Sequence, residues 1–239
     1  MIVYGRNAVR EALRGRRAGR VSDLWATAAA AREPWLAGAA VHDAAQIEER
    51  CGSREHQGVC ADAGEYPYAD GDELLAAAGS LVVALDQVQD PQNLGSICRT
   101  AECAGAAGVA IPERRAAQVT PAVCKASAGA VEHLPVARVR NLADFIIRAR
   151  DAGFWSYGAS AHALEGAAAP VPYDDVDYAG AGVVLVLGGE ADGLRPRVAR
   201  ACDGLVTLPM RGRIESLNVG AAAAALVYEI LQKKLDTSP

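Results

Sequence analysis

The chain has 239 residues, of which 51% are apolar and 22% are charged, so it can bury a substantial core and is not disordered overall. No apolar run reaches the roughly 18 to 20 residues that a membrane-spanning helix needs, and the N-terminal stretch has no signal-type apolar core. We therefore expect a cytoplasmic location and no membrane partner. The net charge of −5 argues against wholesale nucleic-acid binding by a uniformly basic surface.

The six cysteines are scattered and form no CxxC pair. Cys51, His56 and Cys60 come nearest to metal-ligand spacing, but zinc sites usually repeat paired ligands and this group stands alone. The cysteines therefore predict buried or incidental thiols in a reducing compartment, and no metal is expected.

The first 60 or so residues predict a small domain that mixes helices and strands. Residues 5–13 (GRNAVREAL) and 44–51 (AAQIEERC) suit helices, whereas 21–27 (VSDLWAT) and 56–63 (HQGVCADA) suit strands. Arginine is concentrated at the start of the chain, where two acidic residues, Glu11 and Asp23, accompany Arg6, Arg10, Arg14, Arg16, Arg17, Arg20 and Arg32. A solvated helix face explains this cluster as well as a phosphate-facing patch does, although arginine pairs bidentately with phosphate.

An acidic stretch rich in Gly and Pro, DAGEYPYADGDE at 62–73, is typical of a linker. We therefore divide the chain into a first domain at 1–63, a linker at 64–77 and a second domain at 78–239. In the second domain, strands alternate with helices, and the predicted strands are 81–86, 108–112, 134–139, 154–160, 182–188 and 204–209. Several strands are continuously apolar, as expected when helices cover both faces of a sheet. This pattern predicts an α/β fold with a mostly parallel sheet.

The turns after three of these strands carry most of the suggestive polar residues. They read DPQNLGSICRT after 81–86, GGEADGL after 182–188, and MRGRIESLN after 204–209. Ligands collect at the carboxyl ends of the strands in open α/β sheets. We therefore expect the three turns to converge at one edge of the sheet.

In the first turn, Asn93 suits a helix N-cap, and Gly95 permits close approach of a ligand or another segment. Arg99 can reach back over the start of the helix, which is unfavourable unless an anion lies there. An ion pair with a surface carboxylate would explain Arg99 on its own just as well.

In the second turn, Gly188 and Gly189 let the backbone approach a flat ligand beside Glu190, although a tight turn with a solvated acid fits too. In the third, Ser216 and Asn218 either cap the last helix or act in the site. The sequence lacks the glycine fingerprints of dinucleotide and triphosphate sites and the nucleophile elbow of hydrolases. The residues alone therefore predict a ligand site without identifying the ligand.

Taken together, the three turns resemble the motifs of the SpoU-type (TrmH-like) RNA ribose 2′-O-methyltransferases of the SPOUT superfamily. The matching stretches are DPQNLGSICRTAECAG, LVLGGEADGL and LPMRGRIESLNVGAAAAALVYE, in the family's order and spacing. The first domain resembles the L30e-like RNA-binding domain of the branch that methylates guanosine in 23S ribosomal RNA. YGRNAVREAL and HQGVCADA carry that resemblance, which thus covers almost the whole chain.

The resemblance implies a deep trefoil knot over about 182–235, which general topology rules would not suggest. It also implies S-adenosylmethionine as the cofactor, held largely by main-chain groups. The positions that match this role are Gly188, Leu208 and Leu217, with Gly189 and Met210 as neighbours. Relatives in the family are dimers that pack through the final helix, and the alanine-rich surface of this helix suits a homodimer.

By the same resemblance, Arg99 activates the ribose hydroxyl beside an RNA phosphate, and the pocket is shaped by Asn93, Glu190, Ser216 and Asn218. The candidate RNA contacts are Arg6, Arg14, Arg16 and Arg17. We expect methylation of ribosomal RNA. The alternatives are the same reaction on transfer RNA and a non-catalytic RNA-binding or ribosome assembly factor, with a small-molecule dehydrogenase as a more distant one.

Overall fold

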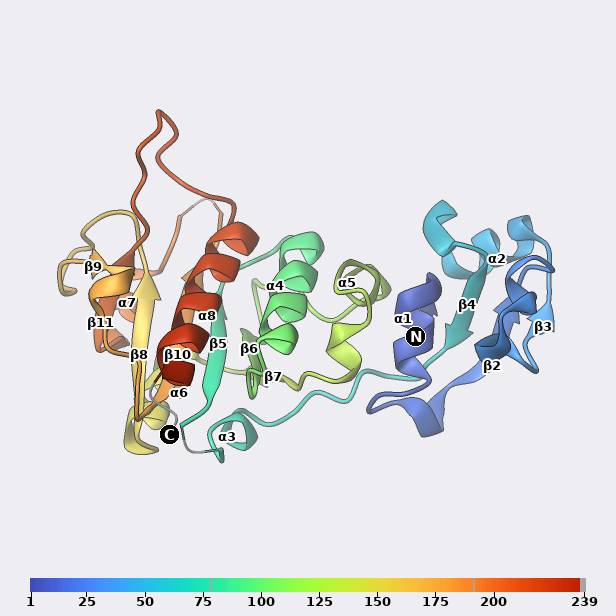
Figure 1. Cartoon of the computed structure of the whole chain (residues 1–239), viewed down its shortest axis with the longest axis horizontal. Helices are drawn as coiled ribbons and strands as arrows, with labels where there is room; N and C mark the ends of the chain where they lie inside the picture. The colour runs from blue at the N-terminus through green and yellow to red at the C-terminus, as the bar shows by residue number, and fades with distance from the viewer. Residues whose placement is uncertain (78, 191, 237–239) are drawn as a thin grey trace.

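Two β-sheets organise the computed structural model, which describes residues 1–77, 79–190 and 192–236. Figure 1 shows a four-stranded sheet at one end of an elongated molecule and a seven-stranded sheet at the other. Among the described residues, no helix is both long and apolar enough to cross a membrane.

The smaller sheet lies in the N-terminal domain. Its strands, in sheet order, are β1 (Ile2–Tyr4), β4 (Val59–Asp62), β2 (Ser22–Ala26) and β3 (Ala40–Val41). The helices are α1 (Arg6–Ala12) and α2 (Ala44–Cys51), with 3₁₀ turns η1 (Ala18–Arg20), η2 (Ala30–Arg32), η3 (Pro34–Leu36) and η4 (Arg54–His56). The two predicted helices and two predicted strands are present. The sequence pattern missed β1 and β3 because strands of two or three residues are too short to show a period.

The larger sheet is parallel throughout and confirms the predicted α/β fold. Its strands, in sheet order, are β7 (Val136–Val139), β6 (Gly108–Pro112), β5 (Leu81–Asp86), β10 (Gly182–Gly188), β8 (Phe154–Ala159), β11 (Gly204–Thr207) and β9 (Val171–Pro172). All six predicted strands are present. The two-residue edge strand β9 is exposed and was not predicted.

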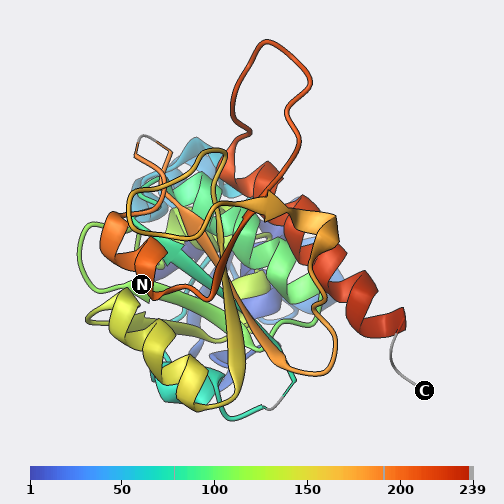
Figure 2. The same cartoon turned by 90° about the vertical axis from the view of Figure 1, so that its left-hand side faces the viewer.

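Helices cover both faces of this sheet, as Figure 2 shows. One layer contains α4 (Pro91–Cys103), α5 (Pro121–Ala126) and α8 (Val219–Asp236), with η5 (Ala130–Glu132) and η6 (Tyr173–Asp175). The other contains α3 (Gly71–Leu74), α6 (Leu142–Asp151) and α7 (Pro196–Ala201). Along β5, Val83 and Leu85 pack toward the first layer, and Val82 and Ala84 pack toward the second. This two-sided burial explains the continuously apolar strands. The trefoil knot and the L30e-like character of the first domain stay predictions.

Gly95 serves the packing of two helices. A Cβ atom at this position would lie 2.4 Å from the Cβ atom of Ala126, at the end of α5. The glycine therefore allows α4 and α5 to pack closely. The sequence predicted that either a ligand or another segment approaches Gly95, and in the structure the approaching group is α5.

The segment 64–77 packs against the larger domain. The Tyr66 hydroxyl donates a hydrogen bond to the carbonyl of Val131 at 2.8 Å. Ala69 forms a parallel bridge with Ala137 of β7, and Leu74 of α3 is buried in the core. The composition is that of a linker, yet the segment is fixed by these contacts.

A fully buried ion pair joins the two domains. Arg17 and Glu132 are each 0% exposed, and Arg17 Nε donates to Glu132 Oε2 at 2.9 Å. Burial alone would lower the pKa of Arg17, but its hydrogen bond to Glu132 and the charge of that carboxylate raise it overall. The prediction that Arg17 faces an RNA phosphate is therefore wrong, because Glu132 already occupies its guanidinium and solvent does not reach it.

Close backbone contacts extend this domain interface along α1. A Cβ atom at Gly15 would lie 2.4 Å from the carbonyl oxygen of Glu132, and one at Gly129 would lie 2.6 Å from the Cβ atom of Glu11. Glu11 also contacts His133 Nε2 at 2.9 Å. The first domain is thus held against α5 and η5 by several contacts at once.

Candidate active site

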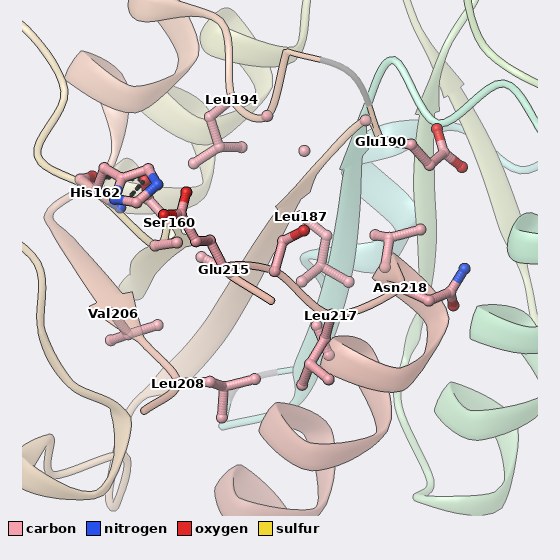
Figure 3. A pocket seen from close by; sticks show the side chains of 18 of the residues that line it. Ser160, His162, Leu187, Glu190, Leu194, Val206, Leu208, Glu215, Leu217 and Asn218 are labelled. Carbon is pink, nitrogen blue, oxygen red and sulfur yellow. Dashed lines mark hydrogen bonds between the residues drawn. The ribbon is translucent and has the colours of Figure 1, made fainter. Parts of the chain in front are cut away.

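A cavity of about 630 Å³ lies at the carboxyl ends of β8, β10 and β11, beside the start of α8. It is lined by the five predicted cofactor residues, Gly188, Gly189, Leu208, Met210 and Leu217, and by Glu190, Ser216 and Asn218 from the predicted catalytic set. Figure 3 shows Ser160 and His162 on one side and Leu217 and Asn218 on the other. The second and third predicted turns therefore converge, as expected from the topology of the sheet.

A chain of hydrogen bonds connects all three motifs. Asn93 Nδ2 donates to Glu190 Oε1 at 2.5 Å, and Asn218 Nδ2 donates to Asn93 Oδ1 at 2.9 Å. Asn93 is nearly buried, with 8% of its surface exposed. This network fixes the Glu190 carboxylate relative to the start of α8, so it joins the first turn to the other two beside the cavity.

Two helix starts are capped by side chains near the cavity. Asp90 caps α4, because its Oδ1 accepts from the backbone N–H of Gln92 at 2.9 Å. The prediction that Asn93 is the cap of this helix is wrong, since Asn93 lies inside α4 and uses its amide in the network instead. Asn218 does cap α8, and its Oδ1 accepts from the backbone N–H of Gly220 at 2.9 Å.

The turn at Gly188 and Gly189, at the end of β10, is packed so closely that neither position can hold a side chain. A Cβ atom at Gly188 would lie 2.2 Å from the carbonyl carbon of Gly193, and one at Gly189 would lie 2.6 Å from the carbonyl oxygen of Gln87. The fully buried Asp86 holds the end of the turn, accepting from Arg195 Nε at 2.7 Å and from its backbone N–H at 2.8 Å. These contacts keep the turn closed beside the cavity.

Arg99 lies outside the cavity of its own chain. It is exposed on α4, six positions after Asn93, and no carboxylate among the described residues pairs with it. The ordinary explanation, an ion pair with a surface carboxylate, thus finds no support within the described chain. Ser216 lines the cavity.

The sequence prediction missed the wall formed after β8. Ser160 and His162 line the cavity there, and Ser160 Oγ donates to the carbonyl of His162 at 2.7 Å. The strand 154–160 was predicted, so the rule that ligands collect at carboxyl ends of strands could have pointed to this turn. The stretch carries no recognisable motif, so its residues alone give no sign of a site.

All six cysteines are free thiols. Burial raises the pKa of the Cys98 thiol to about 12, so it is an unreactive core side chain. Within the described part of the chain, no group of three or more His, Cys, Asp or Glu residues could hold a metal ion.

Comparison with known proteins gives this fold and cavity an identity. Residues 80–228 match the SpoU rRNA Methylase family, and residues 2–69 match the domain described as RNA 2′-O ribose methyltransferase substrate binding. The chain is therefore an enzyme of the RNA ribose 2′-O-methyltransferase class. It belongs to the SpoU family, also called the TrmH family.

Individual relatives agree with this assignment. A Bacillus subtilis protein named as a TrmH family tRNA/rRNA methyltransferase is 42% identical over 185 residues, which cover 75% of this chain and 72% of that protein. The AdoMet-bound rRNA methyltransferase from Sinorhizobium meliloti has a TM-score of 0.78 and 30% identity, covering 97% of this chain and 86% of that one. AviRb, a SpoU methyltransferase from Streptomyces viridochromogenes solved with AdoMet, has a TM-score of 0.80 and 25% identity. The similarity covers 100% of this chain and 91% of that one.

The cavity fits S-adenosylmethionine, the cofactor that the family uses. Its volume lies within the roughly 300–1,000 Å³ range of ligand pockets. Leucine side chains offer apolar surface, and the turn at Gly188 and Gly189 brings main-chain groups to the wall. Three carboxylates, of Glu190, Asp192 and Glu215, also line it and suit a ligand with a sulfonium and an ammonium group.

Replacing Gly188 with alanine is expected to weaken S-adenosylmethionine binding. The new Cβ atom must push against the Gly193 backbone, 2.2 Å away, and overpacking of this kind costs about 1–3 kcal/mol. We expect the affinity measured by calorimetry to fall about tenfold or more. Gly19→Ala is the control, because a Cβ atom there meets nothing within 4 Å. Unchanged affinity in the Gly188→Ala variant would contradict a closed turn at this wall.

Proposed function

We propose that the chain methylates a ribose 2′-hydroxyl in ribosomal RNA, in the branch acting on 23S guanosine. The observation that carries this proposal is the hydrogen-bonded network of Asn93, Glu190 and Asn218, which unites the three motifs beside the cofactor cavity. The ribosomal target is supported by the Sinorhizobium relative, named as an rRNA methyltransferase, whose similarity includes the first domain.

In the proposed reaction, the 2′-oxygen must pass its proton to water or to a group other than Arg99 while it faces the methyl group in line. S-adenosylmethionine supplies an electrophilic methyl group on a sulfonium. Arg99 is assigned to the forming alkoxide and the neighbouring phosphate, because a guanidinium keeps its proton and is a poor base but a strong partner for anions. The network holds the Glu190 carboxylate at the cavity, and Ser216 lies at the same wall.

The direct test is methyl transfer from labelled S-adenosylmethionine to unmodified ribosomal and transfer RNA, followed by digestion. Label on a ribose of a ribosomal fragment supports the proposal, and label on transfer RNA moves the target to the other class. Cofactor binding without transfer to either free RNA would point to an assembled ribosomal particle. Absence of both transfer and cofactor binding would favour a non-catalytic RNA-binding factor.

We also propose a homodimer through the catalytic domain. The outer face of α8 exposes Ala221, Ala225, Tyr228 and Leu235, and Tyr228 and Leu235 are 49% and 59% exposed. The small alanines leave a flat face to which a second copy can pack closely. The helix that carries Arg99, α4, lies beside α8 (Figure 1).

Replacing Tyr228 with lysine is expected to convert this dimer into a monomer, because a charge would be buried in an apolar interface. Light scattering after size-exclusion chromatography measures the mass. The control is Ile147→Lys, at a 46% exposed position of α6 on the opposite face of the sheet. A wild-type protein of monomer mass would refute the dimer. If both variants shifted equally from dimer mass to monomer mass, this interface would be refuted.

A further inference from the structure

Exposed arginines gather at the same edge of the large sheet as the cofactor cavity. Arg114 and Arg115 lie in the loop after β6, Arg138 lies on β7, and Arg140 follows the end of that strand. Among the described residues, no carboxylate forms an ion pair with any of the four. Arg138 stacks on the Tyr68 ring at 4.2 Å, which leaves Arg114, Arg115 and Arg140 as the three outward cations.

Backbone hydrogen bonds tie this loop to the reaction centre. Glu113 N–H donates to the carbonyl of Val139 at 3.0 Å, so the loop after β6 lies against the end of β7. Ala117 N–H donates to the carbonyl of Val88 at 2.8 Å, so the same loop contacts the turn that leads into α4 and Asn93. The three arginines and the motif network therefore share one continuous edge.

A second hollow of about 200 Å³ lies along this edge. It shares Gly189, Glu190, Asp192 and Gly193 with the wall of the main cavity, and it adds Gln87 and Gln89 from the turn after β5. The hollow therefore extends from the cofactor cavity toward the turn that the arginine loop contacts. A strand of RNA leaving the cavity along it would run toward the loop that carries Arg114 and Arg115.

The arginines of the first domain lie toward the other edge. Along α1, Gly5 lies against Lys125, the Glu11 side chain lies against Gly129, and Gly15 lies against Glu132. Since α5 starts after the carboxyl end of β6 and η5 precedes the amino end of β7, α1 runs away from the carboxyl edge. Arg14 and Arg16 come after α1, and they stay predicted contacts for RNA farther from the target ribose.

We propose that Arg114, Arg115 and Arg140 form the surface that holds the phosphates of the RNA flanking the target ribose. Glu113 is the one acid in the stretch 113–118, whereas Glu190 and Asp192 line the cavity and the second hollow. The three cations add positive charge at this edge, which a polyanion requires. The proposal rests on RNA methylation as the function of the cavity.

The test compares two matched triple variants on unmodified ribosomal RNA transcripts. One is Arg114→Gln, Arg115→Gln, Arg140→Gln, and the other is Arg148→Gln, Arg197→Gln, Arg200→Gln on α6 and α7, each removing three exposed charges. Filter binding across a salt series measures RNA affinity, and calorimetry measures S-adenosylmethionine affinity. Thermal melting verifies that both variants fold.

We expect the Arg114, Arg115, Arg140 triple variant to bind RNA about tenfold or more weakly. The slope of log affinity against log salt concentration should become shallower by about 2, because each of three lost phosphate contacts on a single strand contributes ~0.7. The cofactor affinity of this triple variant should stay unchanged, and the variant on α6 and α7 should bind RNA within about twofold of wild type. Equal losses in the two variants, or a loss confined to the variant on α6 and α7, would overturn the proposal. Absence of methyl transfer by the wild type would instead refute the proposed function, which separates the two failures.

Discussion

The Arg99→Ala variant is expected to lose methyl transfer while binding S-adenosylmethionine as the wild type does. Arg99 is exposed, lies outside the cavity and has no carboxylate partner among the described residues, so its removal should disturb neither the fold nor the cofactor. Loss of a charged group that stabilises a developing oxyanion costs roughly 10²- to 10³-fold in rate. Single-turnover transfer to RNA measures the rate, and calorimetry measures cofactor affinity.

Two further variants sharpen the test of Arg99. Arg99→Lys keeps the charge but loses the planar fork of donors, so it should recover a part of the lost rate. Gln92→Ala changes another exposed position of α4 and should stay near the wild-type rate. Turnover of Arg99→Ala within a few-fold of wild type would remove Arg99 from the mechanism.

The Glu132→Ala variant is expected to be strongly destabilised. It would leave the Arg17 guanidinium buried without its carboxylate, and removal of one partner from a buried ion pair costs about 3–5 kcal/mol. Both side chains are 0% exposed, so solvent cannot take the place of Glu132. Chemical denaturation measures the loss as a lower free energy of unfolding.

The control for Glu132→Ala is the Glu11→Gln variant, which touches the exposed contact with His133 at the same interface. Exposed pairs contribute about 0–1 kcal/mol, so this variant should lie close to wild type. The double variant Arg17→Met, Glu132→Leu should recover much of the stability, because apolar side chains can replace a buried pair. A loss below about 1 kcal/mol in Glu132→Ala would contradict the importance of the pair.

The fold of the larger domain could be predicted from the sequence because its central strands are buried on both faces. A stretch such as 182–188 (GVVLVLG) is apolar at almost every position, and helices between such stretches require parallel strands. The short strands β1, β3 and β9 could not be found in this way. They are held by pairing with a longer neighbour, which leaves no periodic signal in their own residues.

The position of the site in the fold could be predicted from the sequence, but the hydrogen bonds within the site could not. The rule on carboxyl ends of strands brought Glu190, Ser216 and Asn218 to one cavity. It could not show whether Asn93 or Asp90 caps α4, because both residue types suit a cap. The amide of Asn93 is instead bonded to Glu190 and Asn218, which lie 97 and 125 positions away.

Arg17 shows why local charge patterns mislead about surfaces. Its neighbours Arg14, Arg16 and Arg20 are exposed, and only Arg17 is turned inward. Its partner Glu132 lies 115 positions along the chain in another domain. No spacing within the arginine cluster marks the buried member, since burial depends on how the two domains meet.

The hydrogen bond between Asn218 and Asn93 also determines when, during synthesis of the chain, the site can assemble. The two residues are 125 positions apart, so at roughly 5–20 residues per second the ribosome adds the second about 6 to 25 seconds after the first. During this interval a nascent chain has its first motif but no cap for α8. It cannot modify an RNA until the start of α8 has been made and has joined Asn93.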